Sequence, residues 1–92
     1  MSHTHTEIVH YSGHVQGVGF RYTTLQVARE FAVTGEVKNL PDGRVRLLVQ
    51  GDKSEVRAFR ESLEERMAAF IRETEAEVDP AHPFIQTFEI AR

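Results

Sequence analysis

The sequence predicts an α+β fold with the element order β-α-β-β-α-β, in which two helices cover one face of a four-stranded antiparallel sheet. Three observations support this order. Apolar residues recur at helical spacing in two segments, 20–33 and 53–71, and they alternate with polar residues in the segments around them. A Pro-Asp-Gly turn at 41–43 separates two of the alternating segments. Right-handed crossovers then give the ferredoxin-like arrangement, a fold that hosts many functions.

Length and composition are those of one small globular domain. The 92 residues can bury one modest core, and we expect a flexible tail over residues 1–6 followed by a single domain over 7–92. The net charge of −3 argues against a general nucleic-acid-binding or membrane-binding protein. The chain has no cysteine, which excludes disulfides, thiolate catalysis and sulfur-ligated zinc. Because the polar start lacks a signal peptide's apolar centre and no apolar run could span a bilayer, we expect a cytoplasmic protein.

A glycine-rich segment follows the first predicted strand, which covers residues 8–15. Residues 13–21 read Gly-His-Val-Gln-Gly-Val-Gly-Phe-Arg, and the next helix is expected to begin at Phe20 or Arg21. Where a glycine-rich loop enters a helix, free backbone N–H groups and the helix dipole attract anions, and the planar guanidinium of arginine fits phosphate oxygens. The loop 14–21 is therefore a candidate phosphate-binding site. Its candidate phosphate-binding residues are Val15, Gln16, Gly17, Val18, Gly19, Phe20 and Arg21.

This segment has other interpretations. From the residues alone, a plain strand-to-helix turn without a ligand is as good an interpretation as a phosphate site. The segment is not a P-loop, because no Gly-Lys-Ser/Thr follows, and the spacing of Gly13, Gly17 and Gly19 does not fit a dinucleotide fingerprint. His14 could act as an acid or base beside the loop, but a solvent-facing strand residue is the stronger interpretation.

The rest of the chain completes the predicted sandwich. The expected elements are a first helix ending at 32 or 33, strands over 35–40 and 44–51, a second helix ending between 71 and 75, a short strand over 76–78, a loop over 79–83 and a closing strand over 84–91. Asp52 and Glu55 fit the start of the second helix, and two prolines break regular pairing in the loop. The expected core stripes are Leu25, Ala28, Phe31 and Ala32 in the first helix and Val56, Phe59, Leu63 and Met67 in the second.

Two motifs make the chain resemble the acylphosphatase family over almost its whole length. Residues 13–21 match the family's Gly-x-Val-Gln-Gly-Val-x-Phe-Arg motif throughout. The second motif, Gly-x-Val-x-Asn followed by a turn, an Asp-Gly pair and a valine, is matched by Gly35, Val37, Asn39, Asp42, Gly43 and Val45. The closing residues 88–92 are similar to the family's final strand. The chain departs from the family at Glu36, where an aromatic or other apolar residue is frequent, and over 75–83, which is hard to align.

The resemblance implies an enzyme that hydrolyses acyl phosphates, the mixed anhydrides of a carboxylic acid and phosphate, to carboxylate and inorganic phosphate. It implies catalytic roles for Arg21, which with the 14–21 loop would bind phosphate, and for Asn39, which would position the attacking water. A carboxylate leaves without protonation, so we expect no metal ion and no other cofactor. The expected partners are a small-molecule acyl phosphate and inorganic phosphate as product and inhibitor, with no nucleic acid and no membrane, and we expect a monomer.

Functions of other classes remain alternatives to this enzyme. Acylphosphatase-like domains also occur within larger proteins, including hydrogenase maturation factors, and a free-standing copy could bind a phosphorylated ligand without turnover. The presence of both Arg21 and Asn39 favours the enzyme, although without the first motif Asn39 would be read as a residue that closes the hairpin. The predicted strand 44–51 lacks the exposed aromatic residues of RNA-recognition modules, and a metal chaperone would need a Cys-x-x-Cys pair.

Overall fold

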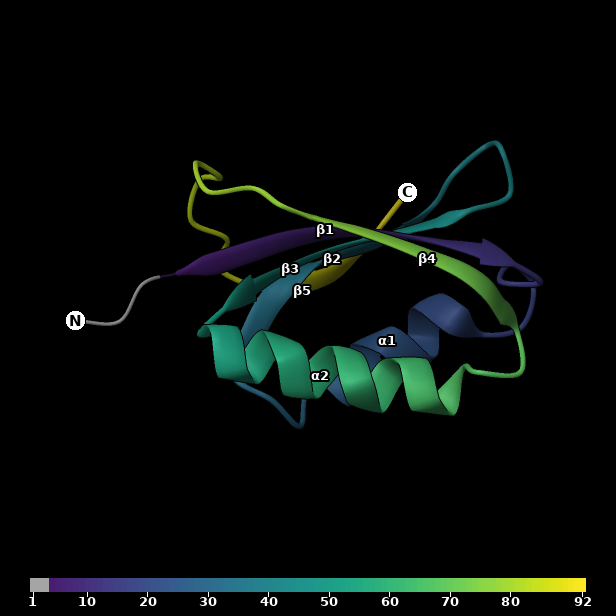
Figure 1. Cartoon of the computed structure of the whole chain (residues 1–92), viewed down its shortest axis with the longest axis horizontal. Coiled ribbons are helices and arrows are strands. Elements are labelled where there is room, and N and C mark those ends of the chain that lie inside the picture. The colour runs from purple at the N-terminus through teal and green to yellow at the C-terminus, as the bar shows by residue number, and fades with distance from the viewer. Residues whose placement is uncertain (1–3) are drawn as a thin grey trace.

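The computed structural model describes residues 4–92, which form one sheet with both helices packed against the same face (Figure 1). The elements in chain order are β1 (His5–Gly13), α1 (Phe20–Ala28), β2 (Val33–Asn39), β3 (Val45–Gly51), α2 (Lys53–Arg66), β4 (Ile71–Val78) and β5 (Phe88–Ala91). This arrangement confirms the predicted ferredoxin-like α+β fold.

The sheet has five strands in the order β4-β1-β3-β2-β5, and it is mixed. Strand β1 pairs antiparallel with β3 and β4, and β2 pairs antiparallel with β3, but β5 pairs parallel with β2. The expectation of four antiparallel strands was therefore wrong. The prolines at 80 and 83 divide the last part of the chain into two strands. The segment that joins these two strands crosses the end of the sheet. As a result β5 lies at the opposite edge from β4 and runs in the direction of β2.

The predicted boundaries of β1 were also wrong at both ends. The strand begins at His5, because Thr6 is buried opposite Gln50 and its hydroxyl accepts a hydrogen bond from Gln50 Nε2 at 2.9 Å. Strand β1 thus includes the last two residues of the expected tail over 1–6, and residues 1–3 of that tail lie outside the described part of the chain. The strand ends at Gly13, where a register shift and a φ of 128° turn the backbone towards the loop.

Both helices bury one side against the sheet and thereby fix the loop that precedes α1. The predicted stripe of α2 is confirmed, since Val56, Phe59 and Leu63 are fully buried. The stripe of α1 is shifted: its buried residues are Phe20, Thr24, Val27 and Ala28. Each fully buried apolar side chain of this size contributes about 1.5–3 kcal/mol. Because Phe20 is the first residue of α1, this burial anchors the start of the helix.

Both helices are shorter than predicted. Helix α1 ends at Ala28 and is followed by a turn, because β2 already begins at Val33. Helix α2 ends at Arg66, and β4 takes up the chain from Ile71 rather than from 76. The charged composition of residues 71–78 suggested that the helix continues. In the structure these residues pair with β1, and this pairing outweighs their composition. Within residues 4–92, no helix combines the length and the hydropathy that crossing a membrane requires.

A polar network joins β1 to α2. The Tyr11 hydroxyl donates to Glu64 Oε2 at 2.7 Å, and Arg60 donates to Glu64 Oε2 at 2.9 Å and to Glu7 Oε1 at 2.8 Å. His5 Nε2 lies 2.7 Å from Glu7 Oε2. Desolvation acts to raise the pKa of Glu7, but the hydrogen bonds from His5 and Arg60 outweigh it and hold this pKa below its ordinary value. Burial, together with the neighbouring Glu64 carboxylate, raises the pKa of Tyr11, which therefore stays protonated as the donor.

Candidate active site

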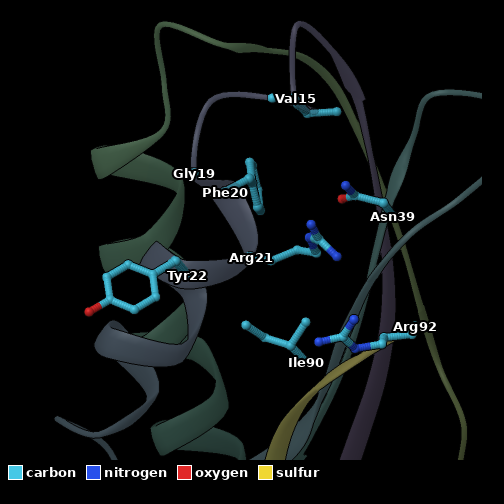
Figure 2. A pocket seen from close by; sticks show the side chains of 9 residues that line it. Val15, Gly19, Phe20, Arg21, Tyr22, Asn39, Ile90 and Arg92 are labelled. Atoms are coloured by element: carbon cyan, nitrogen blue, oxygen red, sulfur yellow. The ribbon is translucent and has the colours of Figure 1, made fainter.

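A pocket of about 320 Å³ opens where three separate segments meet: the loop after β1 with the start of α1, the end of β2, and the end of β5. Figure 2 shows the side chains that line it. The lining residues are Val15, Gly17, Gly19, Phe20, Arg21, Tyr22, Asn39, Ile90 and Arg92.

Backbone forms the wall of this pocket at Gly17 and Gly19. Both glycines adopt the left-handed conformation, with φ of 78° and 79°, and a Cβ atom at either position would project into open space. Gly19 is also the N-cap of α1, where no side chain caps the helix and no acidic residue occupies the first turn. The positive end of the helix dipole therefore meets the pocket without a protein anion beside it.

Arg21 and Asn39 face this pocket from different elements. The Arg21 guanidinium extends from the first turn of α1, and the Asn39 carboxamide extends from the last residue of β2 (Figure 2). The Asn39 Oδ1 atom is buried and has no hydrogen-bond partner in the described structure. A buried acceptor without a donor costs about 1–3 kcal/mol. A bound group that donates to Asn39 Oδ1 would remove this cost, so the atom is suited to receive a ligand or a water molecule.

The structure brings most of the predicted site residues together, but two of them do not line the pocket. Gln16 instead donates from Nε2 to the carbonyls of Leu40, at 2.8 Å, and Arg44, at 2.9 Å. Its side chain thus ties the loop to the β2–β3 turn that follows Asn39. Val18 packs against the hydrophobic core.

His14 lies apart from the pocket. It is exposed, its ring centroid is 6.5 Å from that of Phe70, and it borders a separate depression with Gly13 and Arg72. It follows the register shift at the end of β1 and does not line the cavity that Arg21 and Asn39 share.

Three pocket residues had no predicted role in the site: Tyr22, Ile90 and Arg92. Tyr22 follows Arg21 on α1 and is 60% exposed. Ile90 reaches the pocket because β5 pairs with β2 and places Ile90 opposite Val37. This contact joins segments that are far apart in the sequence, so no local pattern indicates it. Only the spacing of Ile90 and Arg92, which puts them on the same side of a strand, offered a signal.

The pocket is positively charged in an acidic protein. Its lining contains two arginines and no Asp or Glu side chain, whereas the whole chain carries a net charge of −3. Neither arginine forms an ion pair with any residue of the part described. Such a concave cationic site attracts small anions. Over residues 4–92 there is no group of three or more side chains suited to hold a metal ion.

Comparisons with known proteins point to one family. The family model described as acylphosphatase matches residues 8–90. An acylphosphatase of Archaeoglobus fulgidus is 58% identical over 45 residues, which are 49% of this chain and only about half, 51%, of that relative's length. An acylphosphatase of Oceanobacillus iheyensis is 44% identical over 70 residues, 76% of this chain and 77% of the relative. The crystal structure of an acylphosphatase from Bacillus subtilis, 26% identical, superimposes with a TM-score of 0.86 over 96% of this chain and 99% of the other.

Proposed function

Because the chain belongs to the acylphosphatase family, we propose that it hydrolyses acyl phosphates to a carboxylate and inorganic phosphate. The observation that carries this proposal is the shared pocket, in which a cationic loop–helix junction faces a buried acceptor with no hydrogen-bond partner. The first feature suits a phosphoryl group, and the second suits a water molecule beside it.

In this proposal the phosphoryl oxygens bind to the N–H groups of the loop from Val15 to Phe20 and to the Arg21 guanidinium. Left-handed glycines let the oxygens approach the main chain, and the helix dipole adds to the attraction. The planar guanidinium can donate two parallel hydrogen bonds to one phosphoryl group. These contacts exist before and during the reaction, so they contribute both to binding and to the stabilisation of developing charge.

The attacking water is held by Asn39. Its Oδ1 accepts a hydrogen bond from the water, whose oxygen then attacks phosphorus as the bond from phosphorus to the acyl oxygen breaks. The electron pair of that bond leaves with the carboxylate, which needs no proton. We propose that a phosphoryl oxygen of the substrate takes the proton of the water. The pocket lining contains no histidine, aspartate or glutamate side chain. No step requires a metal ion or another cofactor.

The proposal also covers the substrate, the product, the oligomeric state and the location of the protein. The substrate is a small molecule, and inorganic phosphate is both the product and a competitive inhibitor. The protein acts as a cytoplasmic monomer without nucleic acid or membrane, which its acidic net charge and lack of cysteine support. Light scattering of the purified protein tests the oligomeric state.

Alanine variants of Arg21 and Asn39 test the mechanism. We expect Arg21→Ala to abolish turnover and to weaken inhibition by phosphate, and Arg21→Lys to restore little, since a point charge cannot replace the bidentate contact. Asn39→Ala should lower kcat more than a hundredfold, about 3 kcal/mol, with nearly unchanged phosphate inhibition, because its contact is to water. The assay uses benzoyl phosphate with a strong chelator present, after circular dichroism has shown that each variant folds.

Several results would contradict this mechanism. Near-normal kcat in Asn39→Ala would reduce Asn39 to a residue that closes the hairpin. Equal loss of phosphate binding in both alanine variants would move Asn39 into the phosphate site. Loss of activity in chelator, with recovery in magnesium or zinc, would require a metal. Phosphate binding without any hydrolysis by the wild type would make the protein a binding module.

A further inference from the structure

The pocket is much larger than a phosphoryl group. A phosphoryl group fills only part of its 320 Å³. The loop and Arg21 lie on one side of this space, and the end of β5 lies on another (Figure 2). The remaining volume lies next to Ile90 and Arg92, and in the proposed function the acyl part of a substrate would occupy it.

Strand β5 and the residue that follows it contribute an apolar and a cationic side chain to this part of the pocket. Ile90 is half-buried and gives a surface for a hydrocarbon chain or ring. Arg92, two residues further on, directs its guanidinium into the same pocket (Figure 2). It forms no ion pair within residues 4–92, and no Asp or Glu side chain lines the pocket. Its donors are therefore available to a ligand.

We propose that Arg92 determines specificity for acyl phosphates whose acyl part carries an anionic group in addition to the phosphoryl group, most of all a carboxylate. Such substrates are the monophosphates of dicarboxylic acids. The proposal rests on the proposed function, because it assigns the phosphoryl group to the loop and Arg21. The second anion then pairs with Arg92, and the hydrocarbon between the two anions contacts Ile90. A guanidinium binds a carboxylate through two parallel hydrogen bonds, a contact that a neutral acyl group cannot make.

Two substrates of similar shape test this inference: benzoyl phosphate and 4-carboxybenzoyl phosphate. We expect wild type to favour the carboxylated substrate in kcat/KM and Arg92→Gln to lose about tenfold with it, mainly through KM, because a contact to a remote carboxylate is made before and during the reaction. With benzoyl phosphate, Arg92→Gln should stay within about threefold of wild type. Arg29→Gln, at an exposed arginine after α1 and outside the pocket, removes the same charge and should change neither value.

The outcomes separate this inference from the proposed function. Equal losses with both substrates would show that Arg92 acts on the phosphoryl group, and no loss with either would show that it has no role; both overturn the inference. If wild type hydrolyses neither substrate, the proposed function fails. The inference is then decided by calorimetric binding of two stable analogues, benzoylmethylphosphonate and its 4-carboxy derivative. Tighter binding of the carboxylated analogue that Arg92→Gln abolishes supports it, and equal binding overturns it.

Discussion

Gln16 shows how one side chain can set the distance between two halves of a site. It belongs to the loop, yet its amide donates to the carbonyls of Leu40 and Arg44, just beyond Asn39. Those carbonyls also accept from backbone N–H groups, Leu40 from Gly43 and Arg44 from Leu40. Removing the Gln16 amide therefore leaves neither carbonyl without a donor, and the effect on stability is limited to the lost hydrogen bonds.

We expect Gln16→Ala to lower the free energy of unfolding by about 1–2 kcal/mol, from two lost hydrogen bonds. It should also lower kcat about tenfold or more, because the loop and Asn39 are no longer held at a fixed separation. Chemical denaturation and benzoyl phosphate hydrolysis measure the two effects.

His14→Ala, two residues earlier and outside the pocket, should keep most of the activity. A hundredfold loss in His14→Ala would mean that the histidine takes part in acid–base catalysis.

At the scale of elements, glycine at the junction between the loop and α1 has two separable effects, one on backbone strain and one on the space left for a ligand. Gly19 and Gly43 share the left-handed conformation, with φ of 79° and 95°, and both have open space where a Cβ would lie. Gly19 lines the pocket, whereas Gly43 lies in the β2–β3 turn. Replacing either with alanine imposes a similar backbone strain of about 1–2 kcal/mol.

Gly19→Ala and Gly43→Ala are therefore a matched pair. We expect both to lose a similar amount of stability, but only Gly19→Ala to lose activity, by more than tenfold, because its methyl group projects where the phosphoryl oxygens would bind. Urea unfolding and kcat/KM give the comparison. If Gly19→Ala were as active as Gly43→Ala, the backbone at this glycine would not be part of the phosphate site.

Prediction from sequence succeeded where the signal is local. The stripe of Val56, Phe59 and Leu63 in α2 follows from helical periodicity. Motifs a few residues long indicated the loop and Asn39, which line one pocket, while their roles in the reaction stay predictions. Prediction failed where pairing between distant segments decides the outcome. The parallel pairing of β5 with β2 sets Ile90 opposite Val37, and the position of Arg92 at the pocket follows from that register.

At the scale of the whole molecule, the network between β1 and α2 makes stability depend on pH. The pKa of Glu7 is lower in the folded state than in the unfolded chain, because the hydrogen bonds from His5 and Arg60 outweigh the desolvation that raises it. A lowered carboxyl pKa stabilises the fold above the unfolded value, about 4.3, and this stabilisation is lost as the pH falls through the folded pKa.

We therefore expect the free energy of unfolding to fall as the pH is lowered from 5 to 3, and Glu7→Gln to show a shallower fall while being less stable than wild type at pH 7. Urea denaturation at a series of pH values measures this. Glu61→Gln, on the exposed side of α2, is the control and should follow the wild-type curve. Parallel curves for Glu7→Gln and wild type would show that Glu7 does not contribute to the acid sensitivity.

The strand order also has a consequence in time. Only β2 and β3 are neighbours joined by a short turn; every other pairing in the sheet brings together strands that are distant in the chain. Such a topology folds slowly, since long loops must close before the contacts that stabilise them form. During synthesis, the loop and Asn39 leave the ribosome well before Ile90 and Arg92. A nascent chain can thus bring the loop and Asn39 together first, and it completes the pocket with Ile90 and Arg92 only when β5 docks along β2.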